Sequence, residues 1–177
     1  MAFSNPQGNI THLKLEPGYL VADLGAGSGH YTLAAAEAVG AGGKVYAVDI
    51  QKQLVERLKK EAMRRGYDNV EVVWGDLEAK EGSTLKSNSM NAVILSNTLF
   101  QVEDKETALS EVSRILKLGG RMLFIDWSDS FGGLGPQPGH VISVGDARKL
   151  LESAGFEIGE EIPARDHHYG FIARKKR

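Results

Sequence analysis

The chain has no cysteine among its 177 residues. Disulfide bonds, thiolate metal sites and cysteine nucleophiles are therefore excluded from its chemistry. No apolar run approaches the roughly 20 residues of a membrane-spanning helix, and the first residues do not follow a signal-peptide pattern. The formal net charge is −2, so no general attraction to nucleic acid or an anionic membrane is expected. We expect a cytoplasmic protein with no membrane insertion.

A turn of small residues is the most informative feature present. Residues 21–24 read VADL, and Gly25-Ala26-Gly27-Ser28-Gly29 follows them. Glycines let the backbone approach a ligand closely, and the helix predicted from about Tyr31 to Val39 presents free N–H groups there. The spacing differs from the G-x-G-x-x-G turn that binds pyrophosphate, which Asp23 would repel. Asp23 instead favours a ligand with a positively charged, amino-acid-like group.

Acidic residues also end the next two predicted strands. Residues 44–48 read as a strand and lead to Asp49, about 20 residues after the glycine turn, where a carboxylate can accept hydrogen bonds from ribose hydroxyls. Residues 70–74 lead to Gly75-Asp76-Leu77, where a carboxylate can accept a hydrogen bond from an adenine amino group. An ammonium group, a ribose and an adenine together describe S-adenosylmethionine (SAM).

At these residues the chain resembles class I SAM-dependent methyltransferases, in particular their small ubiquinone/menaquinone-biosynthesis-like group with a type 11/31 methyltransferase domain. Matching pieces occur in the family's order: VADLGAGSGHYTLA (21–34), VYAVDI (45–50), WGDL (74–77), NAVILSNTLFQV (91–102) and ILKLGGRMLFIDW (115–127). The resemblance covers about Leu15 to Phe171. A lone glycine turn would be weak support, whereas ordered pieces at compatible spacings are specific.

Strand-like and helix-like runs alternate along the chain, which predicts an α/β fold with a parallel sheet covered on both faces. The resemblance implies a doubly wound, Rossmann-like, mostly parallel seven-stranded sheet with an antiparallel last strand. We expect one methyltransferase domain over residues 1–177, with 1–15 as a short N-terminal flap in which residues 3–9 fold over the cofactor. Relatives usually carry a longer helical cap, so a second copy of the chain or a large substrate is an alternative way to close the site.

Several element boundaries can be predicted from local signals. Helices are expected at about 52–65 and 105–116, the second ended by Gly119-Gly120, and strands at 121–125, 156–162 and 169–174. Ser143 is expected to cap a helix that runs to about Ala154. The glycine- and proline-rich loop 128–142 is either a lid over the substrate or a flexible connection.

The motifs and the resemblance assign a set of residues to the cofactor site. Asp23 contacts the methionine amine or orients the turn, and these roles stay open. Asn97 and Ser96 are alternatively helix N-caps, and Asp76 is alternatively a surface acid. No metal is expected. The cofactor-binding residues predicted are Asp23, Gly25, Ala26, Gly27, Gly29, Tyr31, Asp49, Ile50, Gly75, Asp76, Leu77 and Asn97.

Candidates for a general base lie near the predicted last strand. His167, His168 and Tyr169 precede or begin that strand, and histidine titrates near neutral pH. A structural role is the alternative. Adjacent residues on an extended segment face opposite ways, so the two histidines are not expected to chelate one metal. His140 and Asp126 are further candidates.

The predicted function is methyl transfer from SAM to a small-molecule acceptor, with S-adenosylhomocysteine as product. The alternatives are a SAM-binding accessory subunit without turnover and a methyltransferase acting on RNA or protein. A nicotinamide-dependent reductase is disfavoured by the glycine spacing. The absence of cysteine removes the chemistry of cytosine-C5 and arsenic methyltransferases. Residues 97–100 read Asn-Thr-Leu-Phe rather than Asn-Pro-Pro-aromatic, which disfavours methylation of an exocyclic amide or amine.

Overall fold

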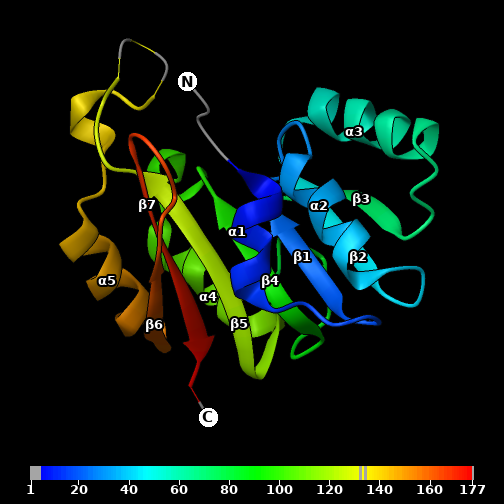
Figure 1. The fold of residues 1–177 in the computed structure, drawn as a ribbon. Helices are drawn as coiled ribbons and strands as arrows, with labels where there is room; N and C mark the ends of the chain where they lie inside the picture. Colours follow the sequence, from blue (N-terminus) through cyan, green and yellow to red (C-terminus); the bar gives the residue numbers. More distant parts are fainter. Residues whose placement is uncertain (1–4, 132, 134, 177) are drawn as a thin grey trace.

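The computed structural model describes residues 5–131, 133 and 135–176 and contains one seven-stranded sheet in the order β3-β2-β1-β4-β5-β7-β6 (Figure 1). Strands β1 to β5 run parallel to one another, whereas β7 is antiparallel to both β5 and β6. The predicted α/β, doubly wound, mostly parallel sheet is therefore confirmed. The strands are β1 Leu20–Leu24, β2 Lys44–Asp49, β3 Val70–Trp74, β4 Met90–Ser96, β5 Leu116–Trp127, β6 Phe156–Ile162 and β7 His168–Lys175.

Helices cover both faces of the sheet. The cores show the layering: apolar residues of α1, α2 and α3 pack on one face, and those of α4 and α5 on the other. The central strands β1 and β4 are buried on both faces, which explains their unbroken apolar sequences. The helices are α1 Pro6–Leu13, α2 His30–Val39, α3 Lys52–Arg64, α4 Lys105–Ile115 and α5 Val144–Ser153, with short 3-10 turns η1 Leu99–Gln101 and η2 Pro138–His140.

Strand order places the site. Strand β1 pairs with β2 on one side and with β4 on the other, so the direction of winding reverses between β1 and β4. In open α/β sheets, a crevice forms at such a reversal, outside the carboxyl ends of the strands. The glycine turn follows β1 at this edge. In Figure 1, the start of α1 and the segment after β5 lie at the same end of the molecule.

The predicted helix end at Gly119-Gly120 is wrong. Helix α4 ends at Ile115, and β5 begins at the next residue and runs through both glycines. The ladder with β4 jumps from Leu116 to Arg121, because the residues between them fold out of register. A Cβ on Gly120 would lie 2.7 Å from the Leu116 side chain. The glycines therefore allow a tight irregularity within β5 rather than ending a helix.

Other local predictions are confirmed. Ser143 accepts a hydrogen bond from the Asp146 amide at 3.1 Å and caps α5. Strands β3 and β6 begin and end where the sequence predicted. Among the residues that the structure describes, none of the helices is both long and apolar enough to cross a bilayer.

The N-terminal segment predicted as a flap contains helix α1. Asn5 caps this helix by accepting from the Gly8 amide at 3.2 Å, and Ile10 and Leu13 are buried in the core. The helix packs against α2 and β5. Residues 1–4, which begin the predicted flap, lie outside the described residues.

Candidate functional site

A cavity of about 720 Å³ lies at the carboxyl ends of β1, β2, β3 and β4. Pockets for small molecules and cofactors commonly have volumes of roughly 300–1,000 Å³. Four segments at the ends of these strands contribute to its wall: 25–28, 48–51, 75–78 and 96–98. Pro6 and Gln7 of α1 and Tyr31 of α2 line it as well.

The glycine turn needs its glycines for space as well as for backbone shape. Gly25 has φ +73°, and a Cβ there would lie 2.3 Å from the Thr98 hydroxyl. Gly29 has φ +81°, and a Cβ there would lie 2.1 Å from Leu58 of α3. Gly25 lines the cavity, whereas Gly29 does not: it lets α2 begin closely packed against α3.

Asp49 joins two parts of the cavity wall. Its Oδ2 accepts from the Gly27 amide at 2.9 Å, and its Oδ1 accepts from the Gln51 amide at 2.8 Å. A carboxylate has about four lone-pair positions, so these two bonds leave acceptor capacity for ligand hydroxyls. The side chain that the sequence assigned to ribose therefore lies at the cavity and also fixes the glycine turn.

Asp23 lies behind the glycine turn. It is 2% exposed, it does not line the cavity, and it accepts a hydrogen bond from the Thr32 hydroxyl at 2.6 Å. Burial raises the pKa of Asp23 to about 6, and the charge of Asp49 adds to the rise, while the Thr32 bond opposes it. Of the two roles that the sequence left open, this geometry supports orientation of the turn and of α2.

The segment after β3 forms a second wall. Gly75, Asp76 and Leu77 line the cavity together with Ile50, which is 53% exposed. Asp76 Oδ1 accepts from the Glu78 amide at 2.9 Å. Apolar side chains beside a carboxylate suit a flat ring that carries a hydrogen-bond donor.

Asn97 occupies a strained position at the third wall. Its φ is +54°, its amide donates to the Ile125 carbonyl at 2.9 Å, and the residue lines the cavity. Its buried Oδ1 has no hydrogen-bond partner within the described part of the chain. The N-cap alternative does not apply, because η1 begins after Thr98 without a side-chain cap. An unsatisfied acceptor in a cavity wall fits a ligand with donor groups, as the amino-acid end of SAM has.

A methyltransferase domain model matches residues 15–155 of the chain. The chain belongs to this methyltransferase family. The resemblance to class I SAM-dependent methyltransferases that the sequence indicated is thereby confirmed, and SAM is the methyl donor of that class.

Named relatives and solved structures agree with this assignment. The chain is 34% identical over 112 residues to a ubiquinone/menaquinone biosynthesis C-methyltransferase, UbiE, of Hahella chejuensis, covering 63% of this chain and 44% of the relative. It is 27% identical over 173 residues to an arsenite methyltransferase of Halobacterium salinarum, covering 90% and 42%. The chain thus spans less than half of either relative. The structure of a SAM-dependent methyltransferase from Aquifex aeolicus superimposes with a TM-score of 0.88 at 26% identity, covering 98% of this chain and 90% of that one.

The predicted catalytic residues of this methyltransferase lie apart from the cavity wall. The Nδ1 atom of His167 lies 2.8 Å from Asp129, and Nδ1 of His168 lies 2.8 Å from the Asp166 carbonyl. Tyr169 is buried and donates its hydroxyl proton to the Ile142 carbonyl at 3.0 Å. The structure therefore groups these residues at the β5–β7 corner.

His168 has one nitrogen without a protein partner. A carbonyl oxygen only accepts, so Nδ1 carries the proton that it donates to Asp166, and Nε2 is the bare nitrogen. Within the described residues, Nε2 is buried without a hydrogen-bond partner. The ring packs on Trp127 with centroids 4.2 Å apart. Burial lowers the pKa of His168, which keeps it neutral.

The other two base candidates have different surroundings. Asp126 is fully buried and accepts from the amides of Phe100 and Trp127, at 3.0 and 2.9 Å. His140 is exposed in the segment after β5. Neither lines the cavity. In the described ranges 5–131, 133 and 135–176, no group of three or more histidine, aspartate or glutamate side chains is placed to hold a metal ion.

The sequence predicted residues 3–9 as a flap over the cofactor, but not the helix α1 that brings part of this segment to the cavity wall. Pro6 and Gln7 reach it because α1 packs on α2, and Asn9 of α1 donates to the Tyr31 hydroxyl at 2.8 Å. The Asn5-Pro6 pair is a local helix-start signal that could have revealed α1. Its position against α2 depends on contacts distant in sequence.

Proposed function

We propose that this methyltransferase binds SAM in the cavity and transfers its methyl group to a small-molecule acceptor, releasing S-adenosylhomocysteine. The observation that carries the proposal is the placement of Asp49 and Asp76 on the wall of one cavity, with the buried Asp23 behind the glycine turn. Acidic groups around a turn of small residues suit a cationic nucleoside and oppose a pyrophosphate cofactor.

Each wall has a proposed partner. Asp49 accepts from the ribose hydroxyls, Asp76 accepts from the adenine amino group, and Ile50 and Leu77 contact the adenine ring. The glycine turn and Asn97 hold the amino-acid end. Because Asp49 already bonds the Gly27 amide, the ribose and glycine-turn subsites are built as one unit.

Bound SAM supplies a methyl group that is already activated on a sulfonium. The residues of the chain then have to hold the acceptor in line and exclude water, and such orientation contributes up to roughly 7–11 kcal/mol in favourable cases. Strand β4 ends at Ser96 on the cavity wall, and Ser96 is in register with Ile125 of β5. We place the acceptor beside this end of β4, toward β5.

His168 is the proposed proton acceptor for the reaction. Trp127 of β5 is in register with His168 of β7, and these strands lie one and two strands beyond β4, the last strand that lines the cavity. The bare Nε2 of His168 can take a proton from the acceptor as the methyl group arrives. Because Nε2 is buried, its surroundings have to open before an acceptor reaches it. The predicted lid, 128–142, begins directly after Trp127, and its residues 132 and 134 lie outside the described residues.

The relatives suggest the size of the acceptor and not its identity. UbiE and the arsenite methyltransferase are named for small acceptors. Arsenite itself is disfavoured here, because this chain has no cysteine. The homodimer and the cytoplasmic location stay predictions, as does the absence of nucleic-acid partners.

Calorimetry with SAM, S-adenosylhomocysteine and NADH tests the cofactor. We expect binding of the first two, and binding of NADH without SAM would overturn the proposal. Transfer of labelled methyl groups from SAM into a fractionated cell extract tests turnover. We expect label in the small-molecule fraction. Label in RNA or protein would favour that alternative, and SAM binding without any transfer would favour an accessory subunit.

A further inference from the structure

The crossover from β3 to β4 lacks the helix that usually makes such a connection. Residues 75–89, all described, contain turns but no helix or strand. Leu77 and Leu85 of this crossover nevertheless belong to the same core as Leu109 and Val112 of α4. The crossover therefore packs on the face of the sheet that α4 covers, where a connecting helix would otherwise lie. Its first residues line the cavity.

Hydrogen bonds fold the start of the crossover into a closed loop. The Asp76 amide donates to the Gly82 carbonyl at 3.1 Å, and the Gly82 amide donates to the Ala79 carbonyl at 3.0 Å. The approach is so close that a Cβ on Gly82 would lie 1.7 Å from the Asp76 carbonyl. Any shift of Gly82 and its neighbour Ser83 is thus transmitted to Asp76 on the cavity wall.

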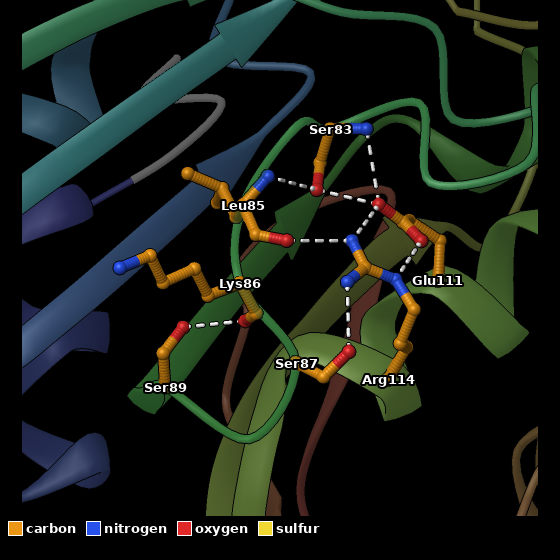
Figure 2. A network of polar contacts seen from close by, with 7 residues as sticks. All are labelled: Ser83, Leu85, Lys86, Ser87, Ser89, Glu111 and Arg114. Carbon is orange, nitrogen blue, oxygen red and sulfur yellow. Dashed lines mark hydrogen bonds and ion pairs between the residues drawn. The ribbon is translucent and has the colours of Figure 1, made fainter.

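An ion pair on α4 fixes the far side of this loop (Figure 2). Glu111 Oε1 accepts from the Ser83 amide at 3.0 Å and from the Ser83 hydroxyl at 2.5 Å. Arg114 donates to both Glu111 oxygens at 2.7 Å and to the Leu85 carbonyl at 2.7 Å. Arg114 also reaches the Ser87 hydroxyl at 3.0 Å. In this crossover, hydrogen bonds to Glu111 and Arg114 take the place of the backbone hydrogen bonds that a connecting helix would make.

The carboxylate of the Glu111–Arg114 pair lies in a buried environment. The Glu111 residue is 4% exposed, and its partner Ser83 is fully buried. Burial alone would raise the pKa of Glu111, but the hydrogen bonds from Arg114 and Ser83 outweigh it and hold that pKa below its ordinary value. A buried pair is weak as a source of stability, and its best-attested use is to specify one arrangement of the chain.

We propose that Glu111 and Arg114 are positioning residues for cofactor recognition, because they hold the 75–85 loop in the conformation that places Asp76 and Leu77 against the adenine ring. The inference rests on the proposed function. Neither side chain touches the cavity. Their effect on the ligand passes through Ser83, Gly82 and Asp76.

Two variants test this role. Glu111→Gln keeps an acceptor for Ser83 but leaves Arg114 without its counter-charge. Ser83→Ala keeps the ion pair and removes only the hydroxyl, so it serves if the first variant folds poorly. Glu161→Gln breaks the exposed pair with Arg148 and is the matched control. The ligands are S-adenosylhomocysteine and S-inosylhomocysteine, whose base lacks the amino group assigned to Asp76.

We expect Glu111→Gln to bind S-adenosylhomocysteine about tenfold more weakly. This is the loss expected if the 75–85 loop adopts its binding-competent conformation only about a tenth of the time. Ser83→Ala should change in the same direction by less, and Glu161→Gln should match the wild type. The preference for adenine over hypoxanthine should shrink in Glu111→Gln. Amide hydrogen exchange over residues 76–85 should be faster in both loop variants.

The outcomes separate the two proposals. A wild type that binds S-adenosylhomocysteine, with loop variants that melt earlier but keep its affinity and base preference, would overturn the positioning role alone. A wild type that does not bind S-adenosylhomocysteine would overturn the proposed function.

Discussion

The aspartates around the cavity have different roles. Asp23 is sealed behind the glycine turn with Thr32, whereas Asp49 bonds the Gly27 and Gln51 amides from the cavity wall. The sequence predicts that acids end β1 and β2, because each follows an apolar run. It does not separate the roles, because exposure depends on how the turn folds back over its own strand.

Asp49→Ala tests the ribose subsite. We expect SAM binding to weaken by about 1–3 kcal/mol, because charge-assisted hydrogen bonds to the ligand are lost. The anchor of the Gly27 amide is lost at the same time, which acts in the same direction. Calorimetric titration with SAM measures the change. Glu71→Ala is the control: that carboxylate pairs with Lys44 near the start of β3, at the opposite edge of the sheet. Equal affinities for Asp49→Ala and wild type would show that ribose binds elsewhere.

At the scale of elements, most of the fold could be predicted and most side-chain partnerships could not. Strand β3 and helix α5 have local signals at their ends: an apolar run closed by Gly75, and Ser143 bonded to the Asp146 amide. The 75–85 loop gives no such signal. Its order depends on Glu111, which lies 28 residues after Ser83 in the sequence. Gly119 and Gly120 led to a wrong prediction of the helix end for the same reason. Their role depends on the pairing of β5 with β4, which lies far away in the sequence.

The prediction on catalysis concerns His168, at the corner formed by β5 and β7. Replacing His168 with asparagine should slow methyl transfer by about 100-fold or more if Nε2 accepts the proton. The affinity for S-adenosylhomocysteine should stay unchanged, because His168 does not line the cavity. Single-turnover transfer of labelled methyl, beside calorimetry, measures both quantities. His140→Asn is the control, since His140 is exposed. A loss of folding with unchanged turnover per folded molecule would assign His168 a structural role.

Considered as a whole, the molecule places buried acids at the edge of the sheet where the cavity lies. Asp126 is the second-last residue of β5 and accepts from the Phe100 amide of η1, so it ties β5 to the turn that follows the cavity wall at Asn97. Burial raises the pKa of Asp126 to about 6 from an ordinary value of 3.8, against the hydrogen bonds from Trp127 and Phe100. The folded chain therefore holds a proton between these values that the unfolded chain has released.

This difference predicts a pH-dependent effect of Asp126→Asn on stability. Because the folded wild type binds more protons between about pH 4 and 6, the contribution of Asp126 to stability falls as pH rises through that range. Asp126→Asn has no carboxyl group at this position, so its stability does not fall for this reason. From pH 4.5 to 7.5, its unfolding free energy should therefore gain on that of the wild type by about 2 kcal/mol. Urea unfolding at both pH values measures the gain, and Asp68→Asn, at an exposed acid, should show none. A gain of the opposite sign would mean that Asp126 is held ionised by its two amide donors, and that burial does not dominate at this corner.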